Sequence, residues 1–247
     1  QKILKLFTLF VKTLIQYGDL MKNIIFSIFI DLEDNSGVHV YKANQLKKYQ
    51  NLLIKVKQNY ANSIGAEFKL FKNDNDWSVF KQKYKDYEYD VVNLYKIYLL
   101  EQLSNDYDNV LYMDLDVIPN TNENFFTTFN LNKICVRSIN ATTKVLLVNH
   151  QKALESYRKS YVDIIKLLDK YNEHVKALCK KAMLINQNIV SKNFELVNTG
   201  IIGGNKKSIG NLKFTQRLDD MLQVLKDTKE EQFYGEEITK FFFANNE

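Results

Sequence analysis

The sequence contains few cysteines, which limits the chemistry that the chain can perform. Only two are present, Cys135 and Cys179. Two thiols are too few for a disulfide framework or a zinc cluster, and they leave redox chemistry without support. This scarcity favours a reducing compartment, and we therefore expect a cytoplasmic protein.

Arginine, linkers and repeats are scarce as well. The net charge of +5 comes almost entirely from lysine, since the arginines are only Arg137, Arg158 and Arg217. The positive charge is spread along the chain instead of forming a basic arm, which favours anionic ligands and argues against a nucleic-acid binder. With 247 residues, 45% of them hydrophobic, and no low-complexity linker or internal repeat, we expect a single domain over 21–247.

No hydrophobic run is long and uncharged enough to cross a membrane. Residues 1–20 have apolar side chains at helical spacing, but Lys2, Lys5 and Lys12 interrupt them. This pattern predicts a short amphipathic helix, and it lacks the small-residue cleavage site of a signal peptide. We expect this helix to pack against the domain, with peripheral membrane contact as the alternative.

From residue 21 onward, strand-like and helix-like segments alternate. Apolar runs predict strands over 24–30, 66–71 and 110–113, and helical periodicity predicts helices over 44–63, 77–84 and 91–103. This order is typical of an α/β fold with a mostly parallel, Rossmann-like sheet flanked by helices. Further along we expect a short helix over 124–129, strands over 134–137, 144–148 and 194–204, a helical excursion over 151–183, and helices over 212–225 and 236–243.

The strand over 110–113 leads into Asp114-Leu115-Asp116. If the chain stays extended, both carboxylates point to the same face. At about 5 Å and an effective dielectric constant of about 20 they would repel by roughly 3 kcal/mol, so the pair needs a cation or a proton. Carboxylate oxygens suit Mn²⁺ or Mg²⁺. The alternative is a solvated turn before Pro119.

Parallel sheets bind ligands outside the carboxyl ends of their strands. Phe29, Ile30 and Asp31 end the first strand, so we expect them and Leu115 to contribute to the same ligand site as the aspartate pair. Two later motifs are further candidates. Asn198-Thr199-Gly200 interrupts a strand, and its glycine permits close approach of a ligand to the backbone.

The second later motif is Glu236-Glu237, at the expected start of a helix. The two carboxylates lie near the positive end of the helix dipole. Capping of the helix explains them without any function. A sugar-binding or catalytic role is the other reading.

Taken together, these segments resemble the GT-A glycosyltransferases, in particular the group that contains glycogenin and bacterial lipopolysaccharide galactosyltransferases. The resemblance implies that Asp114 and Asp116 hold Mn²⁺ against the diphosphate of a nucleotide-sugar donor. Lys96 stands where the family has a basic residue that contacts the donor, although arginine is usual there. Asn198-Thr199-Gly200 matches the family's Asn-x-Gly beside the donor sugar, and Glu236-Glu237 matches its acidic or amide cluster near the anomeric carbon.

The chain departs from this family at one motif. The family's His-x-x-Gly-x-Lys-Pro-Trp, which supplies a third metal ligand, is absent from the sequence. Either the domain continues beyond Glu247 or another ligand replaces this histidine. His150 and His174 lie in the helical excursion and are surface or packing residues by our interpretation. The helical excursion over 151–183 is also longer than the family minimum, and we expect an insertion at that point to help select the acceptor.

We therefore expect a metal-dependent hexosyltransferase that takes a sugar from a nucleotide-diphosphate donor, of UDP type, and passes it to a glycan, protein or lipid acceptor. In this hypothesis Glu237, Glu236 and Asn198 are catalytic, and the resemblance favours retention of anomeric configuration. One alternative is an inactive sugar-nucleotide-binding or scaffolding domain. The other, a nucleotidyltransferase, normally has a glycine-rich loop after the first strand, where residues 31–37 contain one glycine.

Overall fold

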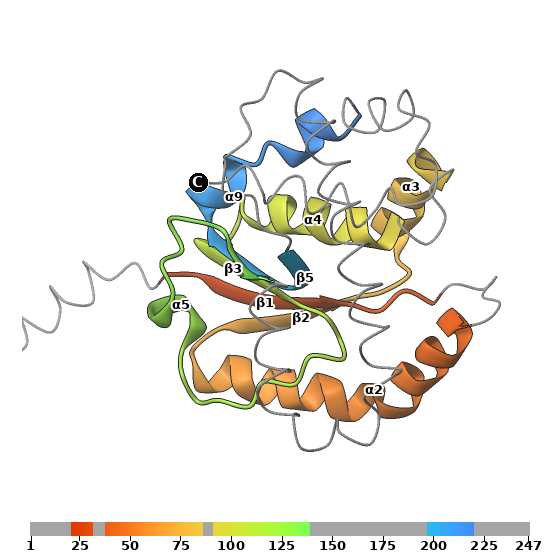
Figure 1. Ribbon diagram of the computed structural model, residues 1–247, viewed down its shortest axis with the longest axis horizontal. Coiled ribbons are helices and arrows are strands. Elements are labelled where there is room, and N and C mark those ends of the chain that lie inside the picture. Colours follow the sequence, from red (N-terminus) through yellow and green to blue (C-terminus); the bar gives the residue numbers. More distant parts are fainter. Residues whose placement is uncertain (1–20, 32–37, 86–90, 139–196, 220–247) are drawn as a thin grey trace, which may run out of the picture.

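Figure 1 shows the computed structural model of the protein, which describes residues 21–31, 38–85, 91–138 and 197–219. These residues form a five-stranded sheet with helices on both faces. In chain order the elements are β1 (Asn23–Ile28), α2 (Val38–Ser63), β2 (Glu67–Phe71), α3 (Asn75–Lys83), α4 (Val91–Leu103), β3 (Asn109–Met113), α5 (Phe125–Thr128), β4 (Cys135–Ser138), β5 (Val197–Asn205) and α9 (Lys206–Gly210).

The sheet is mixed, with the strand order β2-β1-β3-β5-β4. Strand β1 pairs in parallel with β2 and with β3, which confirms the parallel arrangement predicted from the alternation of strands and helices. Strand β5 is antiparallel to both of its neighbours, β3 and β4. Because β5 runs in the opposite direction, its beginning lies beside the end of β3, where Met113 pairs with Ile201.

The hydrophobic core has two halves, one on each face of the sheet. Ile24, Phe26 and Ile28 of β1 pack with residues of α3, α4 and α9. Ile25 of β1 and Leu111 of β3 pack with α2 on the other face (Figure 1). Successive side chains of a strand point to opposite faces, so the apolar residues 24–26 and 28 of β1 contribute to both halves of the core.

The helix expected over 212–225 begins differently in the structure. A short helix, α9, comes first because Asn205 and Ser208 form a capping box that starts a helix directly after β5. Lys213 then adopts a left-handed backbone conformation with φ of 49°. Residues 214–219 are helical. The predicted start at residue 212 is therefore wrong, whereas α4 coincides with its predicted range of 91–103.

Several predicted segments lie outside the described residues: the helix over 1–20, the strand over 144–148, the helical excursion over 151–183 and the helix over 236–243. Among the residues that the structure does describe, none belongs to a helix with the length and apolar character needed to cross a membrane.

Candidate functional site

The aspartate pair lies on a turn, not on a strand. Strand β3 is buried along its whole length and ends at Met113. The amide of Val117 donates to the carbonyl of Asp114 at 3.0 Å, which closes a turn over 114–117. The prediction that the chain stays extended through Asp116 is therefore wrong, and strand alternation no longer determines where the two carboxylates point. Asp114 is half-buried and Asp116 is exposed.

Asp114 is held by contacts on both sides. Its amide donates to the carbonyl of Gly200 at 2.8 Å, which ties the turn to β5. The hydroxyl of Tyr112 donates to Asp114 Oδ1 at 2.5 Å, and Tyr112 itself is only 3% exposed. The carboxylate orientation is thus set by a buried tyrosine of the preceding strand.

The second carboxylate oxygen of Asp114 faces Gly200. A Cβ atom added at Gly200 would lie 3.0 Å from Asp114 Oδ2 and 3.0 Å from Asn198 Oδ1. This spacing is tighter than ordinary van der Waals contact, so the missing side chain is what allows the two oxygens to lie close to the backbone. The Gly200 amide also donates to Asn198 Oδ1 at 2.9 Å, which orients the side chain of exposed Asn198.

Lys96 reaches the same motif from α4. Its ammonium donates to Thr199 Oγ1 at 2.7 Å and lies 5.6 Å from the ring centroid of Tyr112. Only 4% of Lys96 is exposed. The structure therefore brings together three separate parts of the sequence: Lys96, the Asp114 turn and the Asn198-Thr199-Gly200 segment.

Lys57 of α2 is a residue of this site that we did not predict. It is fully buried, and its ammonium donates to the carbonyls of Leu115 at 2.7 Å and Val117 at 2.6 Å. Burial lowers the pKa of Lys57 to about 8, an effect that the negative charges of Asp116 and Asp114 partly oppose. The chain thus supplies a cation of its own next to the aspartate pair.

The sequence did contain a signal for Lys57. The buried residues of the second half of α2 include Leu53, Tyr60 and Ala61. Position 57 lies one helical turn from Leu53 and from Tyr60, so a lysine occurs in the middle of an apolar stripe. A charged residue at a core position requires a partner, and α2 is otherwise so rich in lysine that this one does not stand out.

The end of β1 lies at the same edge of the sheet as Asp114, since β1 and β3 are parallel. Phe29 and Ile30 are half-buried there. Asp31 and Asn73 form a reciprocal pair of hydrogen bonds, in which the Asp31 amide donates to Asn73 Oδ1 at 2.8 Å and Asn73 Nδ2 donates to the Asp31 carbonyl at 2.9 Å. The carboxylate of Asp31 also forms an ion pair with Lys47 at 2.6 Å.

Four residues considered in the sequence analysis have no described position. Glu236, Glu237, His150 and His174 lie outside the described residues. Within the described part of the chain, no group of three or more histidine, cysteine, aspartate or glutamate residues could hold a metal ion. Asp114 and Asp116 therefore remain a pair there.

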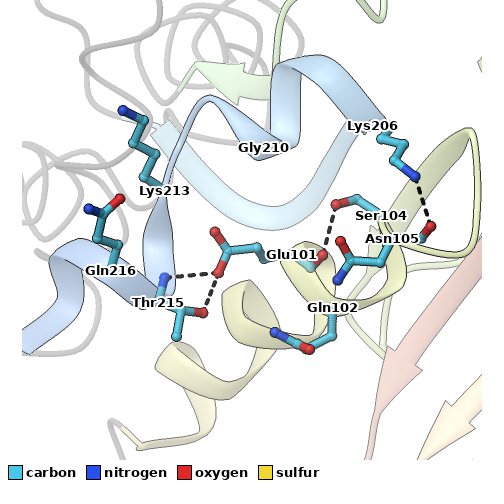
Figure 2. A pocket seen from close by; sticks show the side chains of 9 residues that line it. All are labelled: Glu101, Gln102, Ser104, Asn105, Lys206, Gly210, Lys213, Thr215 and Gln216. Atoms are coloured by element: carbon cyan, nitrogen blue, oxygen red, sulfur yellow. Dashed lines mark hydrogen bonds between the residues drawn. The ribbon is translucent and has the colours of Figure 1, made fainter.

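A separate pocket of about 570 Å³ lies between the end of α4 and the segment after β5. Its position is at the opposite end of β3 from Asp114, where Asn109 pairs with Asn205. Figure 2 shows that its polar groups bond to one another: Glu101 accepts from the amide and hydroxyl of Thr215, and Lys206 donates to the Asn105 carbonyl. We interpret the hydrogen bonds around this pocket as structural contacts that hold α4 against the chain after β5.

Comparison of the chain with models of protein families, with curated proteins and with solved structures found no significant match. The chemical character of the site consequently rests on its own residues. They provide a pair of carboxylates on a tightly held turn, two buried lysine ammonium groups, and a buried glycine whose missing side chain lets Asp114 and Asn198 lie close to the backbone.

Proposed function

We propose that the protein is a metal-dependent glycosyltransferase of the GT-A type, which transfers a sugar from a nucleotide-diphosphate donor of UDP type to an acceptor hydroxyl. The observation that carries the proposal is the hydrogen-bonded junction of the Asp114 turn with Gly200. Lys96 joins this junction through Thr199. These groups suit a sugar diphosphate. The carboxylates can bind a cation, the ammonium can offset the charge of the phosphates, and the glycine permits close approach to the backbone.

The donor set fits a divalent cation. Carboxylate oxygens are preferred ligands of Mn²⁺ and Mg²⁺, which bind through one or two protein carboxylates together with substrate phosphates. Asp114 Oδ1 accepts from Tyr112, and Asp114 Oδ2 faces Gly200, where no side chain separates it from the backbone. In this proposal Asp114 and Asp116 hold the cation, which would act as a Lewis acid on the departing diphosphate.

The protein residues would position the donor and stabilise charge. Lys96 places a positive charge, shielded from water, next to the motif that would contact the sugar. Asn198, oriented through its Oδ1, can present its amide N–H groups to a sugar hydroxyl. Phe29, Ile30 and Asp31 at the end of β1 would contact the nucleotide. Glu236 and Glu237 would supply the carboxylate at the anomeric carbon, in a retaining reaction.

A sugar-nucleotide-binding or scaffolding domain without turnover is the second candidate, and Lys57 is the observation that favours it. The Lys57 ammonium offsets part of the repulsion between the two aspartates. The pair is therefore explicable as a structural charge cluster, without a metal ion.

A donor screen separates these candidates. Thermal unfolding of the protein is measured with UDP-glucose, UDP-galactose and other nucleotide sugars, with and without Mn²⁺, because a ligand that binds only the folded state raises the apparent stability. Metal-dependent stabilisation followed by release of UDP supports the transferase. Stabilisation without release, with acceptors present, supports the binding domain. No stabilisation by any donor would contradict both the transferase and a sugar-nucleotide-binding domain.

A further inference from the structure

Lys57 holds the backbone of the turn that carries the aspartate pair. Its single ammonium bonds to the carbonyls of Leu115 and Val117, at 2.7 Å and 2.6 Å. We propose that Lys57 is a positioning residue, which fixes the Asp114–Val117 turn and thereby determines which divalent cations the aspartate pair accepts. This inference rests on the proposed function, since it assumes that the pair binds a metal ion.

The surrounding hydrogen bonds show how completely this turn is held. Ser27 donates to the carbonyl of Met113 at 2.6 Å, and Val117 donates to that of Asp114 at 3.0 Å. With the two bonds from Lys57, the carbonyls of residues 113, 114, 115 and 117 all have donors. A backbone restrained at so many consecutive groups cannot adjust freely to an ion of a different radius.

Helix α2 extends this restraint beyond the turn. The hydroxyl of Tyr60 donates to the carbonyl of Glu123 at 2.9 Å, and Asn124 Nδ2 donates to the carbonyl of Ile64, the residue after the helix, at 3.3 Å. Lys57 contacts the turn itself. One ammonium has three donors, so it can satisfy both converging carbonyls, and either carbonyl left buried without a partner would be unfavourable.

The charge of Lys57 and its hydrogen bonds act on metal binding in opposite directions. The positive charge repels any cation at the aspartates, whereas the bonds keep the carboxylates in place. Absolute affinity therefore does not isolate the positioning role. The ratio of affinities for two divalent ions does, because both ions carry the same charge and lose the same repulsion. Mn²⁺ and Ca²⁺ differ in radius, and Ca²⁺ accepts larger and more flexible sites.

The test compares Mn²⁺ and Ca²⁺ binding by calorimetry, in the presence of UDP, in the wild type, Lys57→Met and the control Lys55→Met. Lys55 is exposed on the same helix, so its variant has the same change in net charge. We expect the preference for Mn²⁺ over Ca²⁺ to fall at least fivefold in Lys57→Met and to stay within twofold in Lys55→Met. General loss of folding would lower both affinities equally and leave the ratio unchanged.

Hydrogen exchange at the Val117 amide provides a second, metal-free measurement. Release of the turn in Lys57→Met should accelerate this exchange at least tenfold relative to Lys55→Met. If Lys57→Met does not fold, Lys57→Gln, which retains a shorter N–H donor, is measured in its place, with a smaller change in the same direction. An unchanged metal preference, or an unchanged exchange rate, would overturn the inference. Failure of the wild type to bind either metal with UDP would instead overturn the proposed function.

Discussion

The ammonium of Lys96 donates to Thr199 Oγ1 at 2.7 Å, across a separation of 103 residues. Lys96 belongs to α4 and Thr199 to β5, and the sequence pattern does not indicate that these two elements lie side by side. Because only 4% of Lys96 is exposed, its charge has little water to screen it. The bond fixes the charge beside the segment that also contacts Asp114.

Replacement of Lys96 should weaken nucleotide binding. Lys96→Met retains the apolar stem but removes the charge, so we expect at least a tenfold loss of affinity for UDP, equal to about 1.4 kcal/mol, and little change in the affinity for free sugar. Titration calorimetry with UDP and with the free sugar measures both. Thr199→Val, which removes only the hydroxyl partner, is the matched control. An equal loss in that variant would indicate that Lys96 acts through Thr199 and not on the diphosphate.

Asp116→Ala should abolish Mn²⁺-dependent donor binding. Asp116 is exposed, but its negative charge favours the protonated form of buried Lys57, so its removal should leave the fold intact and lower the free energy of unfolding by about 1 kcal/mol. The measurement is the thermal shift with UDP-sugar, with and without Mn²⁺. Asp106→Ala removes an exposed carboxylate from the loop before β3 and should leave the shift unchanged. A metal titration of Asp116→Ala that matches the wild type would count against the metal assignment.

A methyl group at position 200 should damage the site. In Gly200→Ala the new Cβ would lie 3.0 Å from Asp114 Oδ2 and Asn198 Oδ1. We expect about a tenfold loss of donor affinity, and a decrease of about 1–3 kcal/mol in the free energy of unfolding from overpacking. Gly210→Ala is the control, because a Cβ there meets nothing within 4 Å. Binding assays and urea unfolding of both variants measure the two effects, and normal donor binding by Gly200→Ala would remove this glycine from the site.

The stability contributed by Lys57 should depend on pH. Its pKa is about 8 in the folded protein and 10.5 ordinarily. Between these values the unfolded chain binds more protons, so the wild type gains stability as pH rises from about 8 to 10.5 and loses that gain as pH falls back towards 8. The unfolding free energy of the wild type relative to that of Lys57→Met should therefore increase from pH 7 to pH 10, by an amount on the order of 3 kcal/mol at most.

Urea unfolding of both proteins at several pH values measures this difference. Taking the difference removes the titration of other groups, such as Tyr107, whose pKa is raised to about 12 by burial and by its contact with Glu67. Parallel stability curves for the two proteins would show that Lys57 does not titrate in this range.

The amino-acid sequence was sufficient to predict most of the described sheet. Apolar runs of strand length and helical spacing indicated β1, β2, β3 and α4, because periodicity reflects burial directly. It also marked Asp114, Asp116 and Asn198-Thr199-Gly200 as candidates, since each combines a functional group with the end or interruption of an element. Lys96, inside a helix, was a candidate only through the family resemblance. Glu236 and Glu237 lie outside the described residues, so their predicted role is still a prediction.

Three features depended on tertiary structure. The turn at Asp114 replaces an extended chain because the Val117 amide bonds back to Asp114. The antiparallel direction of β5 brings Gly200 to the end of β3. Lys57 is buried at the carbonyls of Leu115 and Val117. Local periodicity reports which side chains are buried. The antiparallel pairing of β5 and the burial of Lys57 depend instead on hydrogen bonds between residues distant in the chain, and the turn at Asp114, although closed by a local bond, is held by the same long-range partners, Lys57 and Gly200.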